Sequence, residues 1–137
     1  MPSTQPERSR PLRVVVIDAD DLVCQTVAAL LGIGDRIEVI GMAGRPDTAL
    51  ELVVNTRPDV ALVDPRLPDL DTGLALIRRI HEVEPGVRVL VVCSPEFLDL
   101  AAAGQGVDGY LRKTFRPDDL TAALEAASRT SGARLRP

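Results

Sequence analysis

Residues 13–21 read RVVVIDADD, and this stretch decides the fold. The β-branched run from Val14 to Ile17 is too short for a helix and is typical of a strand buried on both faces of a sheet. Acidic residues follow directly, where the chain would leave such a strand. Four further apolar runs, the first and last of them weaker, recur along the chain: 37–40, 60–63, 87–92 and 107–111. The sequence therefore predicts five strands.

The segments between and after these runs have the spacing of amphipathic helices. Five stretches repeat their apolar residues along one side: 22–31, 46–53, 74–83, 96–103 and 117–127. Pro46 and Pro117 stand where a first helical turn would begin. In the first helix we expect Leu22 on the apolar stripe and Cys24 off it. Strands that alternate with helices indicate a parallel sheet covered on both faces, so we expect a doubly wound α/β fold.

Composition narrows the class of protein. The chain has 137 residues, 45% of them hydrophobic and 26% charged, which suits one globular domain. We expect a tail over 1–12, the domain over 13–130, and a second tail or the start of a linker over 131–137. The net charge of −4 is the wrong sign for a protein that grips nucleic acid over its surface. No apolar run could span a membrane, and no secretory signal is visible, so we expect a cytoplasmic protein.

Polar residues gather where the strands end. Asp18 and Asp20 follow the first strand, Asp64 the third and Cys93 the fourth, and Lys113 stands at the end of the fifth. In parallel sheets ligands bind at this carboxyl edge. Clustered carboxylates need a cation, and oxygen ligands suit Mg²⁺, while a lysine can hold a phosphate by charge. These are the parts needed to receive a phosphoryl group, with Asp64 as the nucleophile.

At these residues the chain resembles the receiver domain of bacterial two-component response regulators. Three motifs carry the resemblance, at the expected spacing and in this order: RVVVIDADD at 13–21, PDVALVDPRLPDLDTG at 58–73 and VDGYLRK at 107–113. The chain is most similar to receivers of LuxR/NarL-type regulators, which precede a DNA-binding helix-turn-helix. The resemblance implies a flavodoxin-like sheet of strand order 2-1-3-4-5, a histidine kinase as phosphoryl donor, and Asp64 as the phosphoacceptor.

The resemblance also implies a metal site. Asp18, Asp64 and the backbone carbonyl of Arg66 would hold Mg²⁺. Ala19 stands where the family has a second acidic residue. Asp20 is next along the chain; it would substitute only if the turn into the helix brought it round, and a helix cap is the simpler role. We therefore expect weakened Mg²⁺ binding.

Two further site positions and a switch follow from the same resemblance. Lys113 would neutralise the transferred group. Cys93 occupies the threonine or serine position, and a thiol is the weaker hydrogen-bond donor, so we expect slow phosphorylation. Tyr110 matches the aromatic residue that changes rotamer in the family, and a homodimer is the expected assembly. An apparent insertion between Asp71 and Gly73 predicts a longer loop beside the acceptor.

Alternative functions remain open at this point. An atypical pseudo-receiver would act as a dimerisation or protein-binding module without phosphorylation, and Ala19 and Cys93 favour it. A phosphatase would need a second acid two residues after Asp64, where Arg66 stands. We therefore expect no enzyme beyond Mg²⁺-dependent self-phosphorylation and self-dephosphorylation. Few residues follow the last helix, so we expect no direct nucleic-acid binding by this chain, whether it is a stand-alone receiver or part of a longer regulator.

Overall fold

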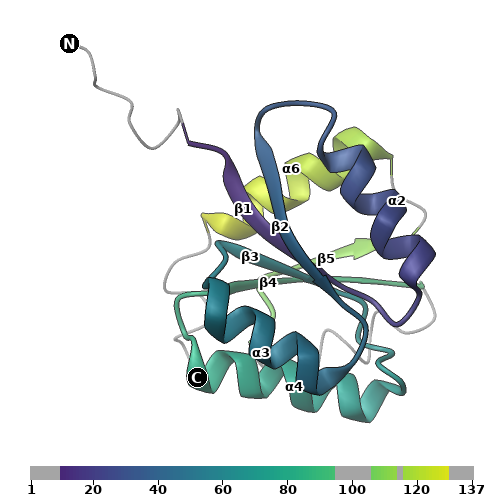
Figure 1. Ribbon diagram of the computed structural model, residues 1–137, viewed down its shortest axis with the longest axis vertical. Coiled ribbons are helices and arrows are strands. Elements are labelled where there is room, and N and C mark those ends of the chain that lie inside the picture. Colours follow the sequence, from purple (N-terminus) through teal and green to yellow (C-terminus); the bar gives the residue numbers. More distant parts are fainter. Residues whose placement is uncertain (1–9, 95–105, 114–115, 130–137) are drawn as a thin grey trace.

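A computed structural model describes residues 10–94, 106–113 and 116–129. Its elements are, in chain order: β1 (Leu12–Ile17), α2 (Asp21–Leu31), β2 (Ile37–Ala43), α3 (Pro46–Thr56), β3 (Val60–Val63), α4 (Leu70–Val83), β4 (Arg88–Cys93), β5 (Gly109–Arg112) and α6 (Pro117–Ser128). All five predicted strands are present, and helices separate the first four, as Figure 1 shows. The helix expected over 96–103 lies outside the described residues.

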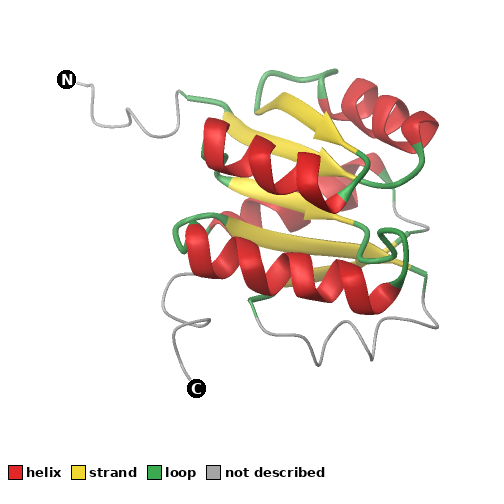
Figure 2. Ribbon diagram, turned by 60° about the horizontal axis from the view of Figure 1, so that its bottom comes forward, coloured by secondary structure: helices red, strands yellow, loops and turns green. Residues whose placement is uncertain are grey.

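The strands form one parallel sheet in the order β2-β1-β3-β4-β5, which confirms the predicted order. Figure 2 shows the strands pointing the same way between two layers of helices. Both sides of the sheet are covered because successive side chains of a strand point to opposite faces. In β1, Val14 and Val16 pack on one side and Val15 and Ile17 on the other, and all four are at most 2% exposed.

Each face of the sheet carries a pair of helices. Helices α2 and α6 cover one face, where Val27 and Leu31 pack in the same cluster as Leu120 and Leu124. Helices α3 and α4 cover the other face, and they too share one buried cluster. Figure 1 shows the two pairs on either side of the strands. Each face of the sheet therefore has its own buried cluster, and neither pair of helices covers the ends of the strands, where a site can form.

The helix starts follow local chemistry. Pro46 and Pro117 are the first residues of α3 and α6, as predicted. Proline fits there because its fixed φ is helical and its missing N–H would have no partner in the helix. Helix α2 begins after Asp20, and α4 begins after Asp69, whose carboxylate accepts the backbone N–H of Thr72 at 2.8 Å.

Two predictions about α2 were wrong. Leu22, expected on the apolar stripe, is 69% exposed, and Cys24, expected off it, is only 4% exposed. The buried side is set by the spacing of Cys24, Val27 and Leu31, which are three and four residues apart. Cysteine packs as a small apolar residue, so it can stand on a buried stripe.

Some boundaries also differ from the prediction. Helix α4 begins at Leu70, so Asp71 and Gly73 lie in its first turn, and the expected longer loop is not formed. Strand β2 continues to Ala43 because Gly41 and Met42 pair with β1 despite their weaker strand propensity. Strand β1 starts at Leu12, the last residue assigned to the tail. Within the described residues no helix is long and apolar enough to cross a membrane.

Candidate functional site

Parallel pairing brings two aspartates together at the carboxyl edge of the sheet. Ile17 of β1 is paired with Val63 of β3, so the residues that follow, Asp18 and Asp64, leave the sheet side by side. The backbone N–H of Asp64 donates to the carbonyl oxygen of Ile17 at 2.9 Å, which extends the pairing by one step. Asp18 is 6% exposed and is the one buried charged residue in the described part of the chain. Two carboxylates thus meet at the centre of this edge.

Lys113 bridges these carboxylates from the end of β5. Its backbone N–H donates to the carbonyl oxygen of Cys93 at 3.0 Å, which fixes the chain beside β4. Its Nζ donates to Oδ2 of Asp18 at 2.9 Å and also to Oδ2 of Asp64. Lys113 is the only lysine in the chain; all the other residues among its 16 lysines and arginines are arginines. The cation is therefore placed where two negative charges need it.

The electrostatics of this lysine follow from its partners. Burial alone would lower the pKa of Lys113, since it disfavours the charged form. The hydrogen bonds to Asp64 and Asp18 outweigh burial, and the pKa of Lys113 is raised above its ordinary value. The side chain therefore stays protonated at neutral pH and acts as a fixed positive charge and hydrogen-bond donor.

The second oxygen of each carboxylate is held by the backbone. Oδ1 of Asp18 accepts the N–H of Asp20 at 2.9 Å, and Oδ1 of Asp64 accepts the N–H of Arg66 at 3.0 Å. Both contacts reach two residues ahead, so each aspartate closes its own turn as the chain leaves the strand. Arg66 itself is exposed. The carboxylates are thus oriented by their own loops as well as by Lys113.

Asp20 has a structural partner of its own. Its Oδ1 accepts the backbone N–H groups of Leu22 at 2.9 Å and Val23 at 3.2 Å, so it is the N-cap of α2. This is the simpler of its two predicted roles. Ala19, between the two aspartates, brings no donor atom. Of the two aspartates between β1 and α2, only Asp18 therefore has its carboxylate in the site.

Two buried cysteines contact the backbone of site residues, and neither is poised to react. Cys93 is the last residue of β4 and is fully buried. Burial raises the pKa of its thiol, the Asp64 carboxylate raises it further, and Lys113 opposes both. Cys24 donates its thiol to the backbone carbonyl of Asp18 at 3.4 Å, and burial likewise raises its pKa. Both remain thiols at neutral pH.

Tyr110 lies on β5, the edge strand that carries Lys113, and its side chain is 43% exposed. Burial of the rest of the ring raises the pKa of its hydroxyl, and the nearby Asp108 adds to this. The tyrosine therefore lies at the surface of the sheet edge, two residues back along the strand from the end that holds Asp18 and Asp64.

Gly73 is a site residue whose role sequence reasoning missed. It is buried in the first turn of α4, and a Cβ atom there would lie 1.5 Å from the carbonyl oxygen of Pro65. The backbone that follows Asp64 therefore rests directly against the helix, which only glycine permits. Gly73 closes the motif at 58–73, but the sequence predicts a loop there and does not show how closely this glycine approaches Pro65.

The oxygen atoms at this edge are of the kind that Mg²⁺ prefers, but few of them carry charge. Mg²⁺ accepts one or two protein carboxylates and keeps several waters. Asp18 and Asp64 are two such carboxylates, joined through Lys113 Nζ, and the Arg66 carbonyl is in the same turn as Asp64. Among the described residues no group of three His, Cys, Asp or Glu side chains could hold a metal. The residues therefore fit Mg²⁺, with fewer charges than a strong site has.

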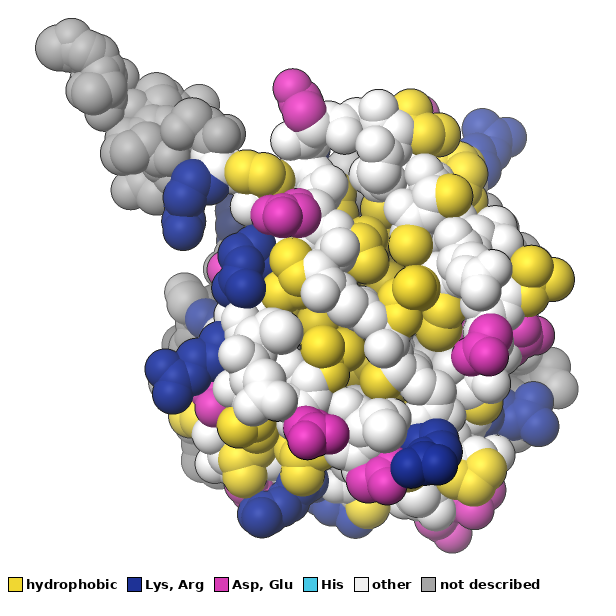
Figure 3. All heavy atoms as spheres, in the orientation of Figure 1, with side chains coloured by type: hydrophobic (Ala, Val, Ile, Leu, Met, Phe, Trp, Pro, Cys, Tyr) yellow, Lys and Arg dark blue, Asp and Glu magenta, His cyan; other side chains and the backbone are white. Residues whose placement is uncertain are grey.

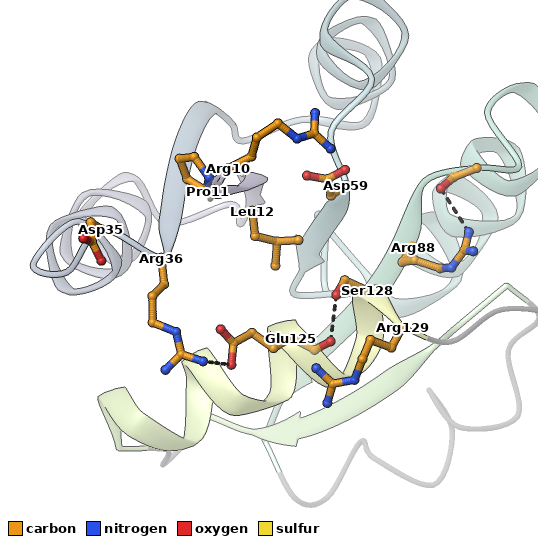
Figure 4. A pocket seen from close by; sticks show the side chains of 11 residues that line it. Arg10, Pro11, Leu12, Asp35, Arg36, Asp59, Arg88, Glu125, Ser128 and Arg129 are labelled. Carbon is orange, nitrogen blue, oxygen red and sulfur yellow. Dashed lines mark hydrogen bonds and ion pairs between the residues drawn. The ribbon is translucent and has the colours of Figure 1, made fainter. Parts of the chain in front are cut away.

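A separate hollow lies at the opposite end of the sheet, and Figure 4 shows the side chains around it. Both basic and acidic residues line it: Arg10, Arg36, Arg88 and Arg129, and Asp35, Asp59 and Glu125. Arg36 and Glu125 form an ion pair across it. The Arg36–Glu125 pair lies at the end of the sheet where the strands begin, whereas ligands of parallel sheets bind where the strands end, so we place the chemistry at the Asp64 edge.

Comparisons with known proteins agree with this geometry. The family model for the response regulator receiver domain matches residues 14–125. The nitrate/nitrite response regulator protein NarL of Escherichia coli is 30% identical over 120 residues, which are 86% of this chain and 55% of that protein. The signal receiver domain of the response regulator NarL from Mycobacterium tuberculosis matches with a TM-score of 0.75 and 30% identity, covering 88% of this chain and 99% of that domain.

A third relative limits what can be carried over. A protein-glutamate methylesterase/protein-glutamine glutaminase of Anaeromyxobacter dehalogenans is 39% identical over 104 residues. The match covers 76% of this chain but only 27% of that protein. The chain thus spans about half, or less, of the curated relatives named here, and the similarity extends to the receiver part alone.

Proposed function

This chain belongs to the family of response regulator receiver domains, and on that premise we propose that Asp64 accepts a phosphoryl group from a histidine kinase. The observation that carries the proposal is the shared contact of Lys113 with Asp18 and Asp64. A nucleophilic carboxylate, a second carboxylate and a fixed cation are thereby held together at the edge of the sheet where ligands bind. Arg66, in place of a second acid two residues after Asp64, argues against a phosphatase.

The reaction would proceed at one oxygen of Asp64. This oxygen attacks phosphorus as the bond between phosphorus and the histidine nitrogen breaks, and the histidine ring keeps that electron pair and takes a proton from water. Lys113 stays protonated and pairs with the oxygens of the arriving group. Mg²⁺, bound by Asp18, Asp64 and the Arg66 carbonyl, would supply further neutralisation of charge on those oxygens.

Two residues would make this reaction slower than in a typical receiver. Ala19 gives the metal one carboxylate fewer, and the metal affinity of a site falls with the number of charged ligands. Cys93 offers a thiol where a hydroxyl would donate a stronger hydrogen bond to the phosphoryl group. The same two residues are what favours the second candidate function, a pseudo-receiver that works through protein contacts without phosphorylation.

Phosphorylation would change a protein-binding surface at the edge formed by β5 and the neighbouring helix α6. Tyr110 is half-exposed there, and Lys113 ends the strand. We propose that a change in the partners of Lys113 is passed along β5 to Tyr110, which alters a contact with another protein. The setting we propose is cytoplasmic, since phosphotransfer from a kinase uses intracellular phosphodonors.

Acetyl phosphate provides the test. The protein is incubated with acetyl phosphate and Mg²⁺, and its intact mass is compared with that of an Asp64→Asn variant. We expect a phosphoryl adduct on the native chain and none on the variant. Circular dichroism of both proteins checks the fold. A well-folded native chain that gains no adduct would contradict the proposal and leave the pseudo-receiver as the better account.

The metal site has its own test. Replacing Ala19 with aspartate restores a carboxylate beside Asp18, and we expect Mg²⁺ to bind tighter by about tenfold. Calorimetric titration of Mg²⁺ into both proteins measures the change, with Ala29→Asp on the exposed side of α2 as a control for added charge. Equal affinities of the native protein and the Ala19 variant would show that the metal is held elsewhere.

A further inference from the structure

The hollow where the strands begin is a second place at which charged side chains gather. Its volume is about 1030 Å³, close to the upper end of the roughly 300–1,000 Å³ that small-molecule sites occupy. Four separate parts of the chain each contribute an arginine to it: Arg10 before β1, Arg36 before β2, Arg88 at the start of β4 and Arg129 after α6. Figure 4 shows these side chains around one space.

The balance of charge around the hollow is opposite to that of the whole chain. The chain has 20 acidic and 16 basic residues, but four arginines and three acidic residues line the hollow. Two of these carboxylates already have partners: Asp59 accepts the backbone N–H of Arg13 at 2.8 Å, and Glu125 is paired with Arg36. Figure 3 shows several basic side chains along the left margin of the molecule, where the N-terminal tail joins it. This end of the domain therefore attracts anions.

Two of the arginines have donors available for a ligand. Within the described residues, the side chains of Arg10 and Arg129 form no ion pair and no hydrogen bond, and both residues are exposed. Nη1 of Arg88 donates to the carbonyl oxygen of Gly86 at 3.0 Å, which keeps this guanidinium beside the hollow. Arg10 and Arg129 are therefore the arginines that an anion would meet first.

The ion pair of Arg36 with Glu125 shows how an oxyanion is held in this hollow. Nη2 of Arg36 is paired with Oε1 of Glu125, and the arginine side chain is 65% exposed. An exposed pair of this kind contributes little stability, so it can be exchanged for a ligand. A guanidinium binds phosphate oxygens in the same two-pronged geometry as carboxylate oxygens. A phosphate group can therefore compete with Glu125 for Arg36.

We propose that this hollow binds a small anion that carries two or more phosphate groups. Figure 4 shows the four arginines spread around the space, so a chain of linked phosphates reaches more of them than a single phosphate does. No aromatic side chain of the described residues lines the hollow, so a nucleotide base finds no stacking partner there. The phosphate chain is therefore the part that is recognised, whether the anion is an inorganic polyphosphate or a nucleotide.

Isothermal titration calorimetry with inorganic tripolyphosphate tests the proposal. The titration uses the native chain at constant ionic strength, without Mg²⁺ or a phosphodonor, so its outcome is independent of the proposed function. We expect a dissociation constant below about 1 mM. Orthophosphate should bind at least about tenfold more weakly because it reaches fewer arginines, and ATP should bind no more tightly than tripolyphosphate. A chain that does not bind tripolyphosphate, or that binds ATP alone, would overturn the proposal.

Two pairs of variants locate the site. Arg129→Gln should weaken tripolyphosphate binding about five- to tenfold, whereas Arg79→Gln, on the exposed side of α4, should leave it unchanged. Glu125→Gln removes the carboxylate that competes for Arg36, so binding should tighten about threefold. Glu82→Gln is its control, because Glu82 is paired with Arg79 outside the hollow. Circular dichroism checks each fold. Equal effects of the two arginine variants, or of the two glutamate variants, would mean general attraction to charge and no site in the hollow.

Discussion

Replacing Gly73 with alanine should destabilise this protein, although alanine is the better helix former by about 1 kcal/mol. The added Cβ would lie 1.5 Å from the carbonyl oxygen of Pro65 and 2.4 Å from its carbonyl carbon. Ordinary contacts of this kind begin at 3.4 Å, so helix and turn must separate by about 2 Å. Both neighbours are backbone and cannot rotate away. Overpacking of this severity costs about 3 kcal/mol or more, which leaves a net loss of about 2 kcal/mol.

Urea denaturation followed by far-UV circular dichroism measures this loss. Gly86→Ala is the control, because a Cβ at Gly86 would meet no atom within 4 Å; its effect should stay below about 0.5 kcal/mol. Moving the turn also moves the Arg66 amide that holds Asp64, so phosphorylation by acetyl phosphate should slow in the Gly73 variant. A Gly73→Ala protein as stable as the native chain would refute the argument from close backbone contact.

Three further predictions concern the site. Lys113→Met leaves two carboxylates facing one another without a cation. The free energy of unfolding should therefore fall by about 2 kcal/mol, a figure that allows for the partial exposure of the lysine. Thermal denaturation should show that Mg²⁺ restores part of this lost stability. Because the pKa of Lys113 is raised in the folded state, the stability difference from the native chain should be full at neutral pH and shrink only as pH rises above about 10.5. Asp20→Ala should cost about 1 kcal/mol in urea denaturation through loss of the cap while leaving the calorimetric Mg²⁺ affinity unchanged; a large loss of affinity would make Asp20 a ligand. Cys24 and Cys93 should react with a thiol reagent at the rate of unfolding, and fast labelling of the folded protein would contradict the buried thiols.

The fold was predictable because its strands are continuous apolar runs. Val60 to Val63 is a strand over the same residues as predicted, since a four-residue apolar run is too short for a helix and suits a strand buried on both faces. The face of α2 was not predictable, because its sequence carries two overlapping stripes and cysteine belongs to either. Packing against the sheet chose the stripe with Cys24 and left Leu22 exposed. The local pattern of apolar residues predicts that a helix forms, but packing against the sheet decides which side of that helix is buried.

The site was predictable where position along a strand sufficed. Asp18, Asp64 and Lys113 each stand at a strand end, and parallel pairing brings strand ends together. The contact between Gly73 and Pro65 depends on two backbones approaching across a turn, and no residue pattern encodes that distance. The helical start at Leu70 was hidden for a related reason: a glycine in a first turn weakens helix propensity, and only the Asp69 cap and that contact compensate.

Neither oxygen of Asp64 is idle. One accepts the backbone amide of Arg66 and the other accepts the ammonium of Lys113. A group added to this carboxylate therefore replaces an existing partner. Addition at the lysine-bound oxygen would displace Lys113 from Asp64 but not from Asp18, and it would perturb the end of β5. Addition at Oδ1 would displace the Arg66 amide, and it would perturb the turn whose Pro65 carbonyl lies against Gly73 of α4. The oxygen that is modified would thus decide whether β5 or the turn before α4 is perturbed first.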